Sequence, residues 1–183
     1  YSPGSGTVLS SHEVSLGYKE VDDPSVYVRF ELADEENTYF LAWTTTPWTL
    51  ISNIALAVGT QIEYSKVRIS SGEKAGESLI VATARLDKIA EEYETVATYS
   101  GAELVGRHYQ RLFDLPEAKD VNDGWRVVGA DYVSTEDGTG IVHQAPAFGA
   151  EDYEVCQREG LPMFNPMGPD GHFLPDTPLV AGE

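Results

Sequence analysis

The chain of 183 residues has a single cysteine, Cys156, and lacks any long hydrophobic run. One cysteine excludes an internal disulfide and any metal site built from several thiolates. The apolar runs are only a few residues long, whereas a membrane-spanning helix needs about 20 apolar residues. No signal-peptide pattern opens the chain. We therefore expect a soluble protein that makes no membrane contact, and a cytoplasmic location.

Basic residues are also scarce. Twelve Lys and Arg stand against 30 Asp and Glu, which gives a formal net charge of −18. A protein that wraps a phosphate backbone normally carries a basic patch, whereas the basic residues here are scattered singly. The composition therefore leaves room for contact with only a short end of a nucleic acid, and an acidic, soluble surface explains most of the charge.

Hydrophobic residues make up 42% of the chain and aromatic residues 10%, which predicts a globular fold with a real core. Many short apolar segments with two helical patterns, and no regular alternation of strand with helix, favour an α+β fold that is mostly β. We expect a distorted β-barrel core with a few helices packed outside. A single domain over 1–183 is predicted, with a flexible start at 1–10 and a Pro/Gly-rich tail at 161–183.

The strand predictions rest on alternation of apolar and polar residues and on bounding turns. Strands are expected at 14–16, 26–32, 38–43, 54–58, 62–69, 78–82, 125–133 and 141–143, with a short extended piece at 104–109. The alternation slips between Tyr64 and Val67, as a β-bulge would make it do.

Two helices are predicted. Apolar residues at helical spacing favour a helix over 84–97, with its charged residues on the opposite face. A second helix over 150–159 is expected to begin after Gly149 and to end at Gly160 in the C′ position. Residues 116–124 are expected to form a polar loop, and 137–140 a turn.

Three consecutive threonines, Thr44, Thr45 and Thr46, follow one predicted strand and precede Pro47 and Trp48. Pro47 disfavours the α region for the residue before it, so the chain here is extended or turning. β-Branched threonines are stiff about their first side-chain torsion, and each hydroxyl both donates and accepts. The threonine hydroxyls could hydrogen-bond the polar groups of a ligand or hold a water. The alternative is a Thr-rich strand end with its hydroxyls in solvent.

A second group of candidate residues lies at 137–152. Asp152 falls in the first turn of the second predicted helix, where the helix dipole favours a carboxylate that could pair with an ammonium. Ordinary stabilisation of the helix start is the alternative. His143, at a strand end, could bond a ligand hydroxyl or carbonyl, or could simply end the strand. The residues between them, Ala145 to Phe148, are small and apolar, as a tight pocket requires.

No covalent nucleophile is evident. Cys156 lies on the second predicted helix and is expected to be buried in the protein core. No Ser-His-Asp order or nucleophile elbow occurs. His12, His108 and His172 lie far from any partner at metal-binding spacing, so neither a metal nor a cofactor is predicted.

The two motifs together resemble the editing (connective-peptide) domain of the class I isoleucyl-tRNA synthetases. The resemblance is carried by Trp-Thr-Thr-Thr-Pro-Trp-Thr-Leu-Ile-Ser-Asn, ending at Asn53, and by Gly-Thr-Gly-Ile-Val-His-Gln-Ala-Pro-Ala-Phe-Gly-Ala-Glu-Asp, ending at Asp152. It extends from Leu9 onward and is weakest after Leu161. The valyl and leucyl enzymes are similar in fold but carry Arg at the position of Thr46, which favours the isoleucyl member.

The chain departs from the family pattern at two places. Ile51 stands where the family usually has Pro. Ser2 and Ser5 stand where the first half of a zinc knuckle has cysteines, and the second half is missing. The resemblance therefore implies one domain of a larger synthetase from which the knuckle is absent, and no zinc.

The resemblance implies hydrolytic proofreading. The expected substrate is valine esterified to the 3′-terminal adenosine of isoleucine tRNA, and valyl-adenylate is a second candidate; isoleucine is excluded by size. A binding site gains only about 1–3 kcal/mol from one methylene, and the isoleucyl enzyme is the usual example of this limit. The implied partners are the tRNA acceptor end, free L-valine weakly, and the rest of the synthetase, with the domain itself a monomer.

The resemblance also implies residue roles. Asp152 pairs with the substrate ammonium, and Thr44, Trp48 and Phe148 wall the side-chain pocket. His143 bonds near the ester or the terminal ribose. Thr45, Thr46 and Asn53 position the attacking water and the developing oxyanion, while the general base stays unassigned. A module that only guides the acceptor end, an unrelated esterase, and a valyl-type domain that accepts threonine are the rival hypotheses.

Overall fold

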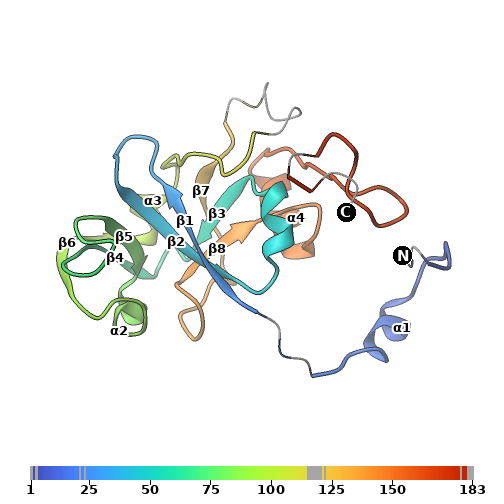
Figure 1. Cartoon of the computed structure of the whole chain (residues 1–183), viewed down its shortest axis with the longest axis horizontal. Helices are drawn as coiled ribbons and strands as arrows, with labels where there is room; N and C mark the ends of the chain where they lie inside the picture. The colour runs from blue at the N-terminus through green and yellow to red at the C-terminus, as the bar shows by residue number, and fades with distance from the viewer. Residues whose placement is uncertain are drawn as a thin grey trace. The chain divides into compact units, whose positions relative to one another are not determined.

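The computed structural model describes residues 2, 4–20, 22, 24–114, 121, 123–177 and 179–180 (Figure 1). The chain divides into two compact units, Ser25–Phe164 and a smaller unit made of Tyr1–Pro24 with Asn165–Glu183. No helix in the described part of the chain is long and apolar enough to span a membrane. All the candidate site residues fall in Ser25–Phe164. The single domain predicted over 1–183 stays a prediction.

Two β-sheets form the Ser25–Phe164 unit (Figure 1). The five-stranded sheet has the order β1 (Val26–Glu31), β2 (Thr38–Thr44), β5 (Ser78–Ala82), β4 (Glu63–Ile69), β6 (Tyr93–Ser100). The three-stranded sheet has the order β7 (Arg126–Gly129), β3 (Ala55–Val58), β8 (Ile141–Gln144). The β2–β5 and β3–β7 pairs are parallel, and the other pairs are antiparallel.

Short helical segments connect these strands. In this unit they are η1 (Pro47–Ser52), η2 (Thr83–Arg85), α2 (Leu86–Ile89), α3 (Gly101–Leu104) and α4 (Ala150–Arg158). The α+β, mostly β class predicted from the sequence is confirmed. The described part of the smaller unit holds α1 (Ser11–Ser15) and two isolated bridges, Ser2 with Thr7 and Met167 with Phe173.

The main core takes side chains from both sheets, among them Phe40, Tyr64, Ile80, Leu56 and Val127. Every residue of β3 is fully buried, which explains why this central strand reads as a continuous apolar run. Strand β2 also lies against β8. This packing brings the end of the threonine-bearing strand close to the strand that carries His143.

The helix predicted over 84–97 is wrong. Only Thr83–Arg85 and Leu86–Ile89 are helical, and Tyr93–Ser100 is the edge strand β6, antiparallel to β4. The helical spacing of the apolar residues is outweighed by the β-branched and aromatic residues of 93–99 and by pairing with β4. The register shift falls between Lys66 and Val67, where the bulge was predicted, but the extra residue is Val96 of the partner strand β6, because Lys66 pairs with Ala97 and Val67 with Thr95.

The strand predicted at 14–16 is also wrong, because Ser11–Ser15 is helix α1. Its start is stabilised by a capping box in which the Glu13 N–H donates to Ser10 Oγ and Ser10 N–H donates to the Glu13 carboxylate. A second capping box, formed by Ser100 and Glu103, begins α3, which includes Leu104. Of the extended piece expected at 104–109, only His108 and Tyr109 make isolated β-bridges.

The remaining strand predictions and the second helix are confirmed within a few residues. Helix α4 follows Gly149, and Gly160 adopts a left-handed conformation with φ of 68° after its end. The polar loop expected at 116–124 lies mostly outside the described residues.

Candidate active site

A pocket of about 560 Å³ opens in the Ser25–Phe164 unit. It is lined by residues 43–46, 48–49, 132, 134, 137–143, 145, 148–149 and 152. These come from the end of β2, from η1, from the β7–β8 loop, from β8 and from the start of α4. The pocket thus joins the two sequence motifs, and it contains seven of the eight predicted site residues: Thr44, Thr45, Thr46, Trp48, His143, Phe148 and Asp152.

The threonine hydroxyls form a connected chain. The Thr46 N–H donates to Thr44 Oγ1 over 3.0 Å, and the Thr44 and Thr46 hydroxyls lie 3.2 Å apart. Pro47 begins the 3₁₀-helix η1, which carries Thr49 to within 3.4 Å of the Thr46 hydroxyl. The structure therefore supports the sequence interpretation that these hydroxyls are aimed, and it extends the chain to Thr49.

Thr49 makes the direct contact with His143. Its Oγ1 lies 3.1 Å from His143 Nε2 and donates its proton to the Thr46 carbonyl over 2.8 Å. A hydroxyl has one proton, so Thr49 Oγ1 must accept from Nε2–H, which fixes the proton of the neutral imidazole on Nε2. The Nδ1 lone pair is then an acceptor, and it is buried with no partner among the described groups.

His143 is 6% exposed, and burial lowers the pKa of its imidazole to about 4. The side chain is therefore neutral at pH 7. Such a group is a weak base, and its Nδ1 has neither a partner nor contact with solvent, so a bound hydroxyl or water reaches it only after a local rearrangement of the pocket. This is the kind of buried, unsatisfied atom that a ligand would complete.

Asp152 lies in the first turn of α4, and its Oδ2 accepts from the Ala145 N–H over 2.9 Å. Burial raises the pKa of this carboxyl, the Ala145 bond partly offsets the rise, and Glu151 adds to it. Burial thus acts against the ionised form, in the opposite direction to the helix-dipole effect predicted from the sequence. None of the ion pairs among the described residues includes Asp152.

Gly149 allows the Asp152 carboxylate to fold back over the helix start. A Cβ at this position would lie 2.9 Å from Asp152 Cγ, closer than two such atoms normally approach. The absence of a side chain at Gly149 is therefore what leaves space for the carboxylate beside the pocket.

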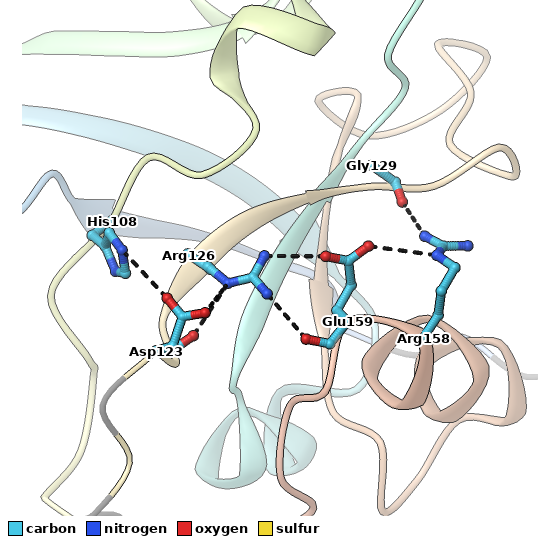
Figure 2. Close-up of polar contacts among 6 residues, drawn as sticks. All are labelled: His108, Asp123, Arg126, Gly129, Arg158 and Glu159. Atoms are coloured by element: carbon cyan, nitrogen blue, oxygen red, sulfur yellow. Dashed lines mark hydrogen bonds and ion pairs between the residues drawn. The ribbon is translucent and has the colours of Figure 1, made fainter.

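The other end of α4 is tied to the three-stranded sheet (Figure 2). Arg126 of β7 donates to the Glu159 carboxylate over 3.2 Å and to the Glu159 carbonyl over 3.1 Å, and it also bonds Asp123. Arg158 donates to the Gly129 carbonyl. These contacts hold α4, and with it Asp152, against the sheet that carries His143.

The charge of the lining is acidic. Asp137 and Asp152 are ionisable acids in the wall, and no Lys or Arg occurs among the described residues that line the pocket. A cation is therefore favoured here and a phosphate is not. The arrangement matches an ammonium-bearing ligand with a hydroxyl-rich neighbour.

Asn53 is not brought into the pocket. Its Oδ1 accepts from the Tyr109 hydroxyl over 2.7 Å and its Nδ2 donates to the Ala55 carbonyl over 3.0 Å. Both ends of the amide are thus engaged in the core, because Asn53 lies beyond the last turn of η1, at the entry to β3. The interpretation of Asn53 as a residue that positions water is corrected accordingly.

Trp48 and Phe148 line the pocket but are 56% and 40% exposed, so they stand at its rim rather than deep in its wall. The sequence analysis also missed residues that the fold supplies. Thr49 could have been found from its i, i+3 relation to Thr46 in a turn that follows Pro47. Tyr132, whose hydroxyl donates to Gln144 Oε1 over 2.8 Å, had no sequence signal.

Among the described residues, no three His, Cys, Asp or Glu side chains gather as metal ligands would. Cys156 is buried in α4 as predicted, and burial raises the pKa of its thiol to about 12. The prediction that the domain needs no cofactor stays a prediction.

Solved structures with a similar fold include a synthetase editing domain. The crystal structure of GlLeuRS-CP1 aligns with a TM-score of 0.59 at 18% identity, over 82% of this chain and 69% of that one. The editing domain of the cytosolic leucyl-tRNA synthetase of P. knowlesi aligns with a TM-score of 0.58 at 13% identity, over 79% of this chain and 66% of that one. These likenesses show the fold. The fold is therefore that of the aminoacyl-tRNA synthetase editing domains.

Sequence relatives identify the member of that class. The isoleucine–tRNA ligase of Thermoplasma acidophilum is 49% identical over 173 residues, covering 94% of this chain and 16% of that protein. The isoleucine–tRNA ligase of Bdellovibrio bacteriovorus is 47% identical over 188 residues, covering 100% of this chain and 17% of that protein. No protein-family model matches the chain. The chain belongs with the editing domains of the isoleucyl-tRNA synthetases and spans a small part of its relatives' length.

Proposed function

We propose that this domain hydrolyses valine from the 3′-terminal adenosine of isoleucine tRNA, as the proofreading part of an isoleucyl-tRNA synthetase. Isoleucine is rejected because it does not fit. The observation that carries the proposal is the pairing, in one acidic pocket, of a half-buried carboxylate without a cation and a neutral histidine with an unsatisfied acceptor atom.

Asp152 binds the α-ammonium of the aminoacyl group. Its carboxylate keeps acceptor capacity after the Ala145 bond, since a carboxylate has about four lone-pair sites. An ammonium supplies the positive charge that the described lining lacks, and the charge-assisted bond fixes the amino-acid end of the substrate.

His143 Nδ1 accepts a hydrogen bond from a hydroxyl of the terminal ribose once substrate binding opens a path to this buried atom. Its other nitrogen is held by Thr49, so Nδ1 has only the acceptor role. The low pKa keeps the imidazole neutral and argues against His143 as the general base. The ribose hydroxyl and the water itself stay the candidates for that role.

Thr45 and Thr46 orient the attacking water and bind the developing oxyanion. Thr45 is exposed and Thr46 half-buried, so both can face bound solvent. An aminoacyl ester is already activated, and orientation with a few hydrogen bonds can supply the catalysis without a covalent nucleophile. Thr44 and His143, which are buried, form the wall against which side-chain size is measured, and Trp48 and Phe148 cover the rim.

The lining also separates the candidate substrates. Valyl-adenylate carries a phosphate, which the acidic lining disfavours, so the ester on tRNA is the better fit. The net charge of −18 implies that affinity for tRNA comes from other parts of the synthetase. We propose a cytoplasmic protein whose editing domain is monomeric. Thr46 stands at the position where the valyl and leucyl enzymes carry Arg, which favours the isoleucyl type over the threonine-accepting valyl type.

The test is a titration with L-valine, L-isoleucine and L-threonine, followed by backbone amide chemical shifts, on the parent and on Asp152→Ala. The proposal predicts weak binding of L-valine, with shifts at pocket residues, and loss of that binding in the variant. Equal binding of valine and isoleucine would refute a pocket selective for size. Preferred binding of threonine would favour the valyl-type alternative.

A further inference from the structure

We propose that Arg85 is a positioning residue for this pocket: its buried guanidinium holds the segment 135–138 in the shape that excludes isoleucine. The proposal rests on the proposed function, because the selectivity it explains is that of the editing reaction. Arg85 does not itself line the pocket.

Arg85 ends η2 and is 8% exposed. Its Nε donates to the Gly138 carbonyl over 2.8 Å, and its Nη1 donates to the Glu136 carbonyl over 2.8 Å and reaches the Thr135 carbonyl at 3.4 Å. No ion pair among the described residues includes Arg85. A buried cation is thus stabilised by the carbonyls of one loop, and the planar fork of arginine suits this multiple contact.

The same loop is held further along by other groups. The Ala82 N–H donates to the Thr139 carbonyl over 2.9 Å, and the Tyr64 hydroxyl donates to the Gly140 carbonyl over 2.7 Å. Among the described hydrogen bonds, these groups fix residues 139 and 140, whereas the carbonyls of 135, 136 and 138 receive theirs from Arg85. The division makes Arg85 the anchor of the earlier part of the loop.

That earlier part forms a wall of the pocket. Asp137 and Gly138 both line it, and Asp137 lies between two residues whose carbonyls Arg85 binds. Gly138 has φ of 65° and approaches the Trp43 ring so closely that a Cβ would lie 3.2 Å from it. The loop thus depends on a residue in the left-handed region and on a tight contact, and the wall is held at a defined distance.

A pocket can discriminate valine from isoleucine by size only if its wall is rigid. Loss of Arg85 leaves three carbonyls without their donor, and the loop relaxes away from the pocket. A wider pocket admits isoleucine and holds valine less well, while the threonine hydroxyls and Asp152 keep their own contacts. We therefore expect the KM for the valyl ester to rise by about tenfold, with a smaller change in kcat and a smaller preference for valine over isoleucine.

The experiment compares parent, Arg85→Ala, Arg85→Lys and the control Arg107→Ala in the full-length synthetase that contains this domain. Arg107 is suited as a control because it pairs with Asp34 outside the pocket. Deacylation of valyl- and isoleucyl-tRNA is measured with and without ethylguanidinium at low millimolar concentration. The proposal predicts the KM rise and the loss of preference in Arg85→Ala, partial recovery with ethylguanidinium, and parental behaviour of Arg107→Ala.

Folded Arg85→Ala with parental KM, kcat and preference for valine would overturn the proposal. If Arg85→Ala does not fold, Arg85→Lys decides, because it keeps the charge and loses the planar fork that reaches several carbonyls: a raised KM with lost preference supports the positioning role, and parental kinetics overturns it.

Amide shifts of the folded variant give a readout that needs no substrate. Changes in amide chemical shift confined to residues 135–140 support the positioning role of Arg85, and unchanged amide shifts in these residues refute it. If the parent itself does not deacylate valyl-tRNA, the proposed function fails, and these shifts still decide whether Arg85 shapes the pocket.

Discussion

Replacing Asp152 by Asn separates a substrate-binding carboxylate from one that only stabilises the start of a helix. The change keeps the shape of the side chain and removes its charge. In the parent, the Ala145 N–H donates a hydrogen bond to Asp152 Oδ2 over 2.9 Å, and the Asn Oδ1 can still accept this bond. A change in binding therefore reports the loss of the charge together with the exchange of one acceptor oxygen for an NH2 donor, both of which oppose an ammonium.

The stability effect follows from the direction of the pKa shift. Burial raises the pKa of Asp152 above its ordinary value of 3.8, so the native state binds this proton more tightly than the unfolded chain does. Stability from this group is then present below about pH 3.8 and is lost as the pH rises through the native pKa. At pH 7 the ionised carboxylate costs stability, and we expect Asp152→Asn to unfold at the same temperature as the parent or at a higher one.

The binding effect has the opposite sign. A hydrogen bond that involves a charged group contributes about 1.5–3 kcal/mol. Its loss should weaken L-valine binding by about 10- to 150-fold. The assay is thermal unfolding together with an amide-shift titration of L-valine at pH 7. Glu154→Gln is the matched control, because Glu154 is an exposed carboxylate of α4 that does not line the pocket and does not shift the pKa of Asp152.

A helix-stabilising role predicts the reverse pattern. Loss of a favourable carboxylate at a helix start would lower the free energy of unfolding by about 0.3–1 kcal/mol. If Asp152→Asn were less stable by this amount and bound L-valine as the parent does, the ammonium-binding role would be refuted.

Three further predictions concern the threonines and the histidine. Thr46→Leu should leave the thermal unfolding transition in place and abolish deacylation of valyl-tRNA, because the larger, apolar side chain fills the water site and offers no hydrogen bond; parental deacylation would contradict the role of Thr46. Thr49→Val removes the acceptor of His143 Nε2–H, so ¹⁵N chemical shifts should show a mixture of imidazole tautomers, whereas Thr49→Ser should keep the Nε2–H form; the same tautomer in all three proteins would contradict the assignment. His143 has a pKa of about 4 in the native state against its ordinary 6.5, so stability is complete above about pH 6.5, falls by about 3 kcal/mol as the pH drops from 6.5 to about 4, and levels off below that. Chemical denaturation across this range should show a shallower pH dependence for His143→Gln, and identical profiles would contradict the buried neutral state.

The strands that hold the pocket were predictable because their sequences agree with their burial. β3 is an uninterrupted apolar run and is buried on all sides. β2 and β8 contain apolar residues and end in polar residues that are buried beside the pocket. Helix α4 has a glycine at each boundary and begins and ends as predicted. The motif residues of the pocket could also be predicted, because they follow these well-defined elements directly.

What could not be predicted depends on contacts between distant segments. Residues 93–100 form a strand only because the edge of β4 is available to pair with them. Asn53 is drawn into the core by Tyr109, a partner 56 residues away. The bond from Arg85 to the 135–138 segment likewise joins residues about fifty positions apart, and no local pattern announces it.

The most direct test of the central claim is the rate at which the synthetase containing this domain deacylates isoleucine tRNA charged with valine or with isoleucine. The account predicts fast hydrolysis of the valyl ester, slow hydrolysis of the isoleucyl ester, and loss of the valyl activity in Asp152→Ala. Equal rates for the two esters, or a parental rate in Asp152→Ala, would contradict it.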